Sequence, residues 1–124
     1  MTQEQKDLLI KDLCARVPYG VKIYSEDFPK ETLAGVVDGD IILHCDKYNY
    51  TYDTPWDIKD VKPYLFPLSS MTEEQNLEYL NTCRGGNVYC PTSKTFDWFD
   101  KNHFDYRDLI PMGLAIDATG LNIY

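Results

Sequence analysis

The dipeptide Asp38-Gly39 constrains the fold of this chain more than any other feature, because it separates two apolar runs at residues 32–37 and 40–45. Asp-Gly is favoured in two-residue hairpin turns of type I′, whose two central residues both have positive φ. Such a turn fixes the register, and the expected pairs are Val37 with Asp40, Val36 with Ile41, and Ala34 with Leu43. One face of the hairpin is then entirely apolar and is predicted to cover the core; it holds Ala34, Val36, Ile41, Leu43 and Cys45.

Three tyrosines alternate with polar residues just after this hairpin, at Tyr48, Tyr50 and Tyr52. An alternation of period two predicts a further strand. If Asp46-Lys47 forms the next turn, Cys45 pairs with Tyr48 and the tyrosines face the core. A loop of odd length places them on the outer face instead, where they are candidates for a binding surface.

Residues 21–24 alternate in the same way before the hairpin, and Pro63 and Pro67 favour an extended segment after it. Residues 57–61, just before Pro63, are predicted as a short strand or a helical turn. We therefore predict an antiparallel meander of at least four strands, built as a small curled sheet or an SH3-like barrel.

Two threonines mark the predicted starts of helices. Thr2 with Gln5 and Thr72 with Gln75 both match the capping-box pattern, in which a threonine side chain and a glutamine three residues later cap the first turn of a helix. The predicted helices cover residues 3–16 and 72–82, and the second is stopped by Gly85-Gly86. In the first helix an apolar stripe is expected to face the core, and it consists of Leu9, Ile10, Leu13, Cys14 and Val17. The opposite face pairs Asp7 with Lys11 and Asp12 with Arg16 at i,i+4 spacing.

The C-terminal part of the chain is predicted to form short helices. Residues 87–92 are predicted to hold an extended piece, and Ser93 or Thr95 then begins a helix that runs to about Lys101. Asp105 is placed to cap a last short helix that Pro111 limits. The prediction is thus an α+β fold in one domain over residues 1–124, with an N-terminal helix, a small meander and two or three C-terminal helices.

Composition excludes several classes of function. The chain has 20 acidic and 12 basic residues and a net charge of -8, which disfavours direct binding of nucleic acid. No apolar stretch reaches the length of a membrane span, and Met1 leads straight into a polar helix start. We therefore expect a cytoplasmic protein without membrane contact. The spacings match no metal-ligand pattern or phosphate loop, so no cofactor is expected.

The four cysteines are Cys14, Cys45, Cys83 and Cys90. In the cytosol they are expected to be reduced thiols, although a disulfide between Cys83 and Cys90 is left open by their even number. His44 and Cys45 are neighbours on a predicted strand and so point to opposite faces, which prevents them from forming a catalytic dyad.

Three blocks of the sequence resemble a known group. The blocks are residues 14–22 (CARVPYGVK), residues 57–74 (DIKDVKPYLFPLSSMTEE), and residues 95–98 with 103–115 (TFDW, HFDYRDLIPMGLA). They resemble a group of short proteins of gut bacteria and their prophages to which no activity is attached. The resemblance implies a bacterial, phage-borne origin and carries over no catalytic residue.

His103, Asp105 and Arg107 form the best polar cluster for catalysis, because a carboxylate can orient a histidine as a general base. The competing interpretation, which we favour, is that Asp105 caps a helix and His103 ends the preceding one. Trp98 and Tyr106 are the aromatic candidates for a recognition surface in the same region. Helical spacing favours a core position for these rings.

These observations rank three hypotheses. The first is a non-enzymatic protein-interaction module, an accessory protein of a prophage or mobile element whose partner is another protein. The second is a small hydrolase-like enzyme that uses His103 with a nearby carboxylate. The third is an acidic DNA mimic that inhibits a nucleic-acid enzyme. A polar pocket at His103 would favour the enzyme, and an exposed aromatic patch would favour the module.

Overall fold

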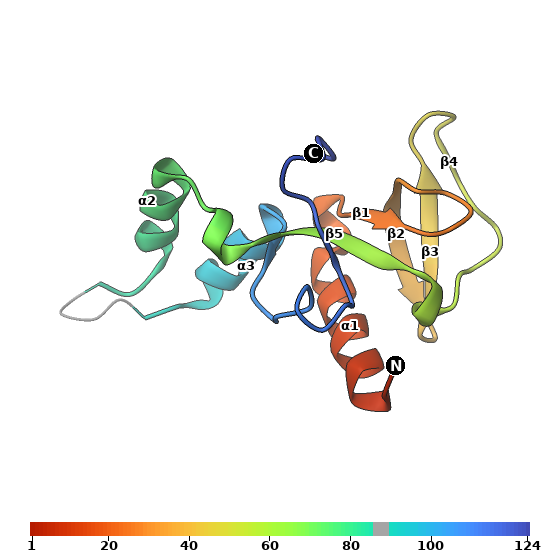
Figure 1. Cartoon of the computed structure of the whole chain (residues 1–124), viewed down its shortest axis with the longest axis horizontal. Coiled ribbons are helices and arrows are strands. Elements are labelled where there is room, and N and C mark those ends of the chain that lie inside the picture. Colours follow the sequence, from red (N-terminus) through yellow and green to blue (C-terminus); the bar gives the residue numbers. More distant parts are fainter. Residues whose placement is uncertain (86–89) are drawn as a thin grey trace.

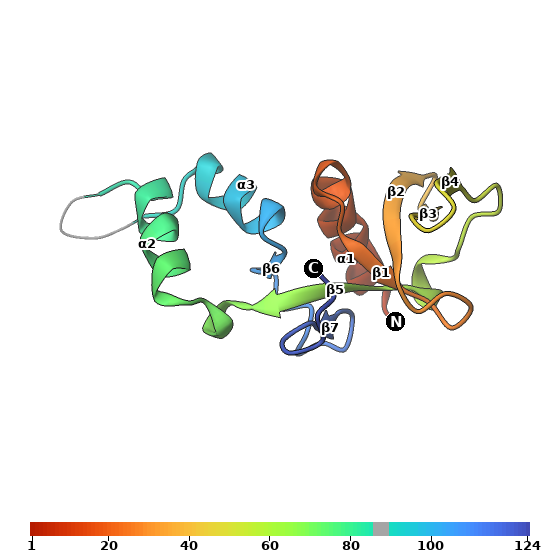
Figure 2. The same ribbon diagram turned by 90° about the horizontal axis from the view of Figure 1, so that it is seen from above.

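A computed structural model describes residues 1–85 and 90–124 of the chain, and its fold is α+β. Helix α1 lies between a group of strands at one end of the molecule and a pair of later helices at the other (Figures 1 and 2). The helices are α1 (Gln3–Arg16), α2 (Glu73–Thr82) and α3 (Ser93–Lys101). The strands are β1 (Lys22–Tyr24), β2 (Glu31–Val37), β3 (Asp40–Cys45), β4 (Tyr50–Thr51), β5 (Lys62–Pro67), β6 (Phe104–Asp105) and β7 (Ile116–Asp117). Short 3₁₀ turns occur at η1 (Val17–Tyr19), η2 (Ile58–Asp60) and η3 (Leu68–Ser70).

The seven strands form one mixed sheet in the order β4-β3-β2-β1-β5-β6, with β7 also paired to β5. Strands β1 to β4 pair antiparallel in chain order, which confirms a four-stranded meander, and β5 pairs antiparallel with β1 on its other side. Strands β6 and β7 run parallel to β5, so the sheet as a whole is mixed. The path runs from β4 to β6 without closing, and an SH3-like barrel is not confirmed.

The Asp38-Gly39 turn has the predicted conformation, with φ of 51° at Asp38 and 79° at Gly39. The pairs Val37 with Asp40 and Val36 with Ile41 are confirmed. The pair Ala34 with Leu43 is wrong, because the register shifts between Leu33 and Gly35 and places Leu33 opposite Leu43. This bulge turns Ala34 to solvent and buries Leu33, so the larger apolar side chain reaches the core.

Both predicted capping boxes are present, since the Thr2 and Thr72 hydroxyls accept hydrogen bonds from the backbone NH of Gln5 and Gln75. A third capping box forms at Thr92 with Thr95, where α3 begins. Helix α2 ends at Thr82 as expected. Gly86 and the first part of the predicted extended piece lie outside the described residues. Cys83 and Cys90 are free thiols.

The core lies between α1 and the sheet. Leu9 and Leu13 of α1 pack on it, together with Val21, Ile23, Leu33, Ile41, Leu43, Val61, Leu65 and Leu109. The predicted stripe is partly wrong, since Cys14 is exposed while Asp12 and Arg16 are fully buried. The reason is that α3 and the C-terminal segment cover the face of α1 that a lone amphipathic helix would leave in water.

The predicted last helix is absent from the structure. Residues 106–108 are irregular and residues 109–113 form turns instead. The two carboxylate oxygens of Asp105 accept hydrogen bonds from the backbone NH groups of Leu109 and Ile110, at 2.9 and 2.8 Å. Asp105 therefore accepts backbone NH groups as a capping residue does, but it stabilises a loop rather than the start of a helix.

We expect Gly39→Val to destabilise the protein by about 1 kcal/mol or more, because a β-branched residue resists the positive φ of this turn. The measurement is the midpoint of urea unfolding. Gly35→Ala is the matched control, since Gly35 lies in the same hairpin without positive φ and an added Cβ meets nothing within 4 Å. Equal midpoints for the two variants would contradict the turn assignment.

We expect Arg16→Met to cost on the order of 3 kcal/mol, because it leaves the buried carboxylates of Asp12 and Asp100 short of a cation. Lys11→Met, on the exposed face of the same helix, is the control and should change stability by less than about 0.5 kcal/mol. Thermal and urea unfolding measure both. If Arg16→Met lowers the free energy of unfolding no more than the control does, the buried ion pairs contribute little to stability.

Candidate functional site

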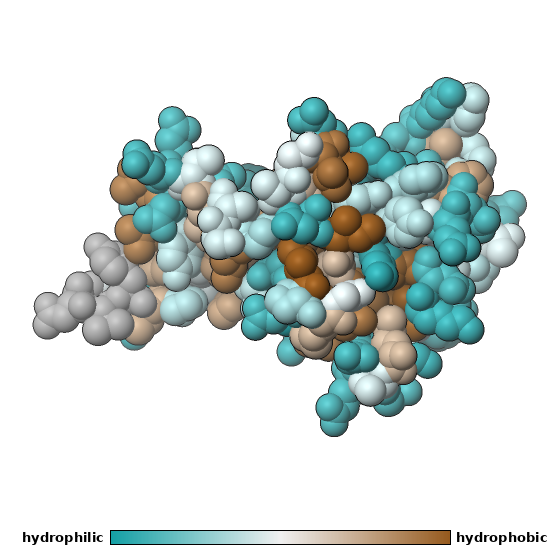
Figure 3. All heavy atoms as spheres, in the orientation of Figure 1, coloured by the Kyte–Doolittle hydropathy of each residue, from teal (hydrophilic) through white to brown (hydrophobic). Residues whose placement is uncertain are grey.

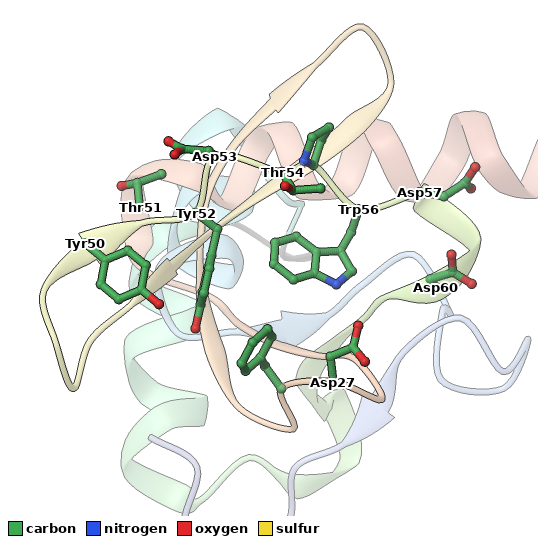
Figure 4. A pocket seen from close by; sticks show the side chains of 11 residues that line it. Asp27, Tyr50, Thr51, Tyr52, Asp53, Thr54, Trp56, Asp57 and Asp60 are labelled. Carbon is green, nitrogen blue, oxygen red and sulfur yellow. The ribbon is translucent and has the colours of Figure 1, made fainter.

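A hollow of about 620 Å³ opens beside β3, where the chain between β4 and η2 runs along the edge of the sheet (Figure 4). We call it the aromatic hollow. It is lined by Asp27, Phe28, Tyr50, Thr51, Tyr52, Asp53, Thr54, Pro55, Trp56, Asp57 and Asp60.

The hollow arises from a mismatch in length between two paired segments. The NH of Tyr52 donates to the carbonyl of Leu43 at 3.0 Å, and Trp56 and Ile41 exchange two backbone hydrogen bonds of 2.8 Å. One residue lies between Ile41 and Leu43 on β3, whereas three lie between Tyr52 and Trp56. The two extra residues must bow away from the sheet, as in a large β-bulge.

The rings are held over the core by this pairing. Residues directly opposite each other in an antiparallel ladder point to the same face. Ile41 and Leu43 face the core, so Trp56 and Tyr52 turn to that side, and both pack against its margin. The floor of the aromatic hollow is therefore fixed by buried residues beneath it.

Four rings meet in the hollow. Phe28, from the loop between β1 and β2, stacks on Tyr52 with centroids 4.9 Å apart. Trp56 stands nearly at right angles to both, with interplanar angles of 76° to Phe28 and 79° to Tyr52. Tyr50 meets Tyr52 edge-on at 5.0 Å and is 47% exposed. The rings thus form a corner open to solvent rather than a closed stack.

Carboxylates surround these rings. Asp27, Asp53, Asp57 and Asp60 line the hollow, whereas no lysine or arginine does. Asp57 Oδ1 accepts the NH of Lys59 at 3.0 Å and caps η2. Within residues 1–85 and 90–124, no ion pair involves any of the four aspartates.

A second hollow of about 480 Å³ adjoins the first and shares Asp27, Trp56 and Asp60 with it. Its other lining residues are Tyr24, Ser25, Glu26, Lys59 and Lys62. The two hollows therefore meet at Trp56, one mainly aromatic and acidic, the other polar and of mixed charge.

The predicted tyrosine face is divided by the structure. Tyr50 and Tyr52 line the aromatic hollow, but Tyr48 does not and is 69% exposed. The predicted pairing of Cys45 with Tyr48 is wrong, because Cys45 pairs with Tyr50 and leaves a loop at residues 46–49. The Asp46 carboxylate accepts hydrogen bonds from Lys22 and Thr32, and these hydrogen bonds lower its pKa.

Trp98 and Tyr106 lie in a different cluster, between α3 and the C-terminal segment. Trp98 stacks on Phe104 with centroids 5.4 Å apart, and Tyr106 stacks on Phe99 at 5.3 Å. The Tyr106 hydroxyl donates to Asp100 Oδ1 at 2.9 Å, and burial together with this bond raises the pKa of Tyr106 to about 12. Both side chains are partly buried and help to dock α3.

His103, Asp105 and Arg107 are each engaged elsewhere. The His103 ring stacks on Tyr124 with centroids 3.8 Å apart, and burial lowers its pKa to about 4. Asp105 holds two backbone NH groups, and Arg107 Nη1 donates to Asp12 Oδ1 at 2.7 Å. In the described ranges no hydrogen bond joins the three side chains. A histidine with so low a pKa is a weak base, and a hydrolase at this position stays a prediction.

His44 and Cys45 point to opposite faces of β3, as expected for neighbours on a strand. Cys45 is buried beneath the sheet, whereas His44 Nδ1 lies 3.1 Å from the Thr51 hydroxyl on the other face. Opposite faces separate the two side chains as the strand geometry requires.

Phe28, Trp56 and the four aspartates were not among the residues singled out from the sequence. The available signal was the run from Tyr50 to Trp56, which has three aromatics around a proline. Phe28 comes from a loop twenty residues or more away in the chain, and only the register of β3 brings it to Tyr52.

Comparison with known protein families, with characterised proteins and with solved structures finds no match to this chain. None of the helices in the described part is long and apolar enough to cross a membrane. On the face drawn in Figure 3, hydrophobic and hydrophilic side chains are interspersed. Function must therefore be inferred from the site itself.

We expect His103 to give the protein a distinct pH dependence. Its pKa is about 4 when folded and about 6.5 when unfolded, so the unfolded chain binds the extra proton first. Stability is then lost as pH falls from about 6.5 to about 4. The loss is about 1–2 kcal/mol once partial exposure is taken into account.

The test is urea unfolding between pH 7 and pH 4 for the wild type and His103→Asn. Asparagine accepts the positive φ of 64° at this position and does not titrate, so the stability of the variant should fall less over this range. His44→Asn, which removes the only other histidine, is the control and should follow the wild type. Parallel curves for all three proteins would disprove the assignment.

Proposed function

We propose that this protein is a non-enzymatic interaction module that binds a short segment of a partner protein in the aromatic hollow. The observation that carries the proposal is the open corner of Phe28, Tyr50, Tyr52 and Trp56, fixed over the core by backbone pairing with β3. Tyr50 is exposed, and Tyr52 and Trp56 are partly exposed. Tyrosine and tryptophan are among the side chains that most often dominate binding energy at protein interfaces.

The backbone around the hollow supports an extended segment as the ligand. The NH groups of Asp53 and Thr54 make no hydrogen bond to any residue in 1–85 or 90–124. These residues lie at the free edge of the sheet, beyond β3. An exposed edge with unpaired amides is a common docking place for an extended peptide.

The chemistry of the lining favours binding over catalysis. It contains no histidine, cysteine, serine or lysine, so it lacks the nucleophile–base pairs, such as Ser–His or Cys–His, that activate a nucleophile for covalent catalysis. The resemblance to proteins of prophages fits an accessory role of this kind in a mobile element. The partner is another protein, and the DNA-mimic hypothesis has no comparable feature in its favour.

We expect peptides selected from a random displayed library to bind the wild-type protein and to lose about tenfold in affinity, about 1.4 kcal/mol, for Tyr50→Ser. Tyr50 is half-exposed, so this change should leave the fold intact. Tyr48→Ser is the matched control, because Tyr48 lies nearby on the same connection but outside the hollow. Isothermal titration calorimetry measures the affinities.

Two outcomes would contradict the proposal. One is a selection that enriches no peptide above a blank surface. The other is an equal loss of affinity in the Tyr48 and Tyr50 variants, which would place the ligand away from the hollow.

A further inference from the structure

The charge around the aromatic hollow is one-sided. Four of its lining residues are aspartates, and none is a lysine or an arginine. Of the four carboxylates, only that of Asp57 has a hydrogen-bond partner in the part of the chain that the structure describes, and that partner is the backbone NH of Lys59. Lys59 and Lys62 line the adjoining hollow, but neither forms an ion pair with these carboxylates in the described residues, so a ligand of positive charge would meet carboxylates that no protein cation contacts directly.

The rings add a second attraction for the same charge. The faces of tryptophan and tyrosine are electron-rich and attract ammonium and guanidinium groups, and tryptophan does so most strongly. Trp56 stands at 79° to Tyr52, so the two ring planes form a corner that opens into the hollow. Figure 4 shows the Asp27 and Asp60 carboxylates near the Trp56 indole, and these three residues are the ones shared with the second hollow.

The size and composition of the hollow favour an organic cation over a metal ion. Among residues 1–85 and 90–124, no group of three or more histidine, cysteine, aspartate or glutamate side chains is close enough to hold a metal. The four aspartates lie around aromatic rings, and these rings offer no ligand atoms to a metal ion. A side chain with an apolar stem and a charged end matches both the rings and the carboxylates.

We propose that the aromatic hollow takes a lysine or arginine side chain of the partner segment. The aliphatic stem lies against Tyr52 and Trp56, and the charged end reaches Asp27 and Asp60. This inference rests on the proposed function, because it names the chemistry of the segment that the module binds. Ammonium and guanidinium share this chemistry, and the experiment distinguishes them.

The probes are the N-acetyl methylamides of arginine, lysine, citrulline and norleucine, added to ¹⁵N-labelled protein and followed by NMR. The indole NH of Trp56 is the reporter, identified by its persistence in Trp98→Phe, since the chain has two tryptophans. We expect the arginine or the lysine compound to shift this signal with millimolar affinity. The neutral analogues, citrulline and norleucine, should bind at least threefold more weakly.

Substitution of the lining aspartates tests which carboxylates contact the charged end of the ligand. Asp27→Asn and Asp60→Asn should each weaken binding of the cationic probe by about threefold or more, and added salt should weaken it further. Asp40→Asn is the matched control, because Asp40 is an exposed aspartate of β3 that lines neither hollow. It should bind the probe like the wild type.

Each contrary result has a separate meaning. If library peptides bind through Tyr50 but citrulline matches arginine, or the Asp27 and Asp60 variants match Asp40→Asn, the cationic ligand is wrong and the interaction module stands. If neither peptides nor probes shift Trp56, both proposals fail. If the same signals shift with protein concentration alone, a second copy of the chain occupies the hollow and the inference is overturned.

Discussion

The structure depends first on Arg16, a fully buried cation at the end of α1. Its Nε donates to Asp12 Oδ2 at 2.8 Å, its Nη2 donates to the carbonyl of Phe104 at 2.6 Å, and Asp100 lies 3.9 Å away. Burial raises the pKa of Asp100, which shows how strongly this site resists unpaired charge. Because a buried charge without partners costs several kcal/mol, α1, α3 and β6 are held in the arrangement that pairs the Nε and Nη2 of Arg16, while its Nη1 has no partner among the described residues.

This constraint divides the molecule into two ends with different properties. At the helical end, Phe99, Phe104 and Tyr106 pack on one another around the ion pairs, and Phe96 lies on the outer side of this cluster with 43% of its surface exposed. At the sheet end, Tyr50 and Trp56 are anchored only on one side, and the other side opens into the aromatic hollow. Strand β5 joins the two ends by pairing with β1 and with β6 (Figure 2). The helical end therefore uses its rings mainly for packing, whereas the sheet end holds rings that border a hollow.

Local chemistry made much of the fold predictable from the sequence. The threonine caps and Asp38-Gly39 act over a few residues, and α1, α2, β2 and β3 begin or end close to where they indicate. The bulge at Ala34, the loop at 46–49 and the burial of Asp12 with Arg16 depend on partners far along the chain. The i,i+4 spacing of Asp12 and Arg16 is the same on an exposed face as on a buried one. The aromatic hollow was missed for the same reason, since its cause is a difference of two residues between paired segments.

The way the aromatic hollow is built also affects how a ligand would bind in it. Trp56 is tied to Ile41 by two backbone hydrogen bonds, and Ile41 is fully buried, so the floor is ordered before any ligand arrives. A ligand that docks there has to order few protein side chains, which removes one of the main costs of association. The aspartates are instead carried by exposed loops and are screened by water and salt. Affinity should therefore come mainly from the rings, and the choice among ligands of similar shape mainly from the carboxylates.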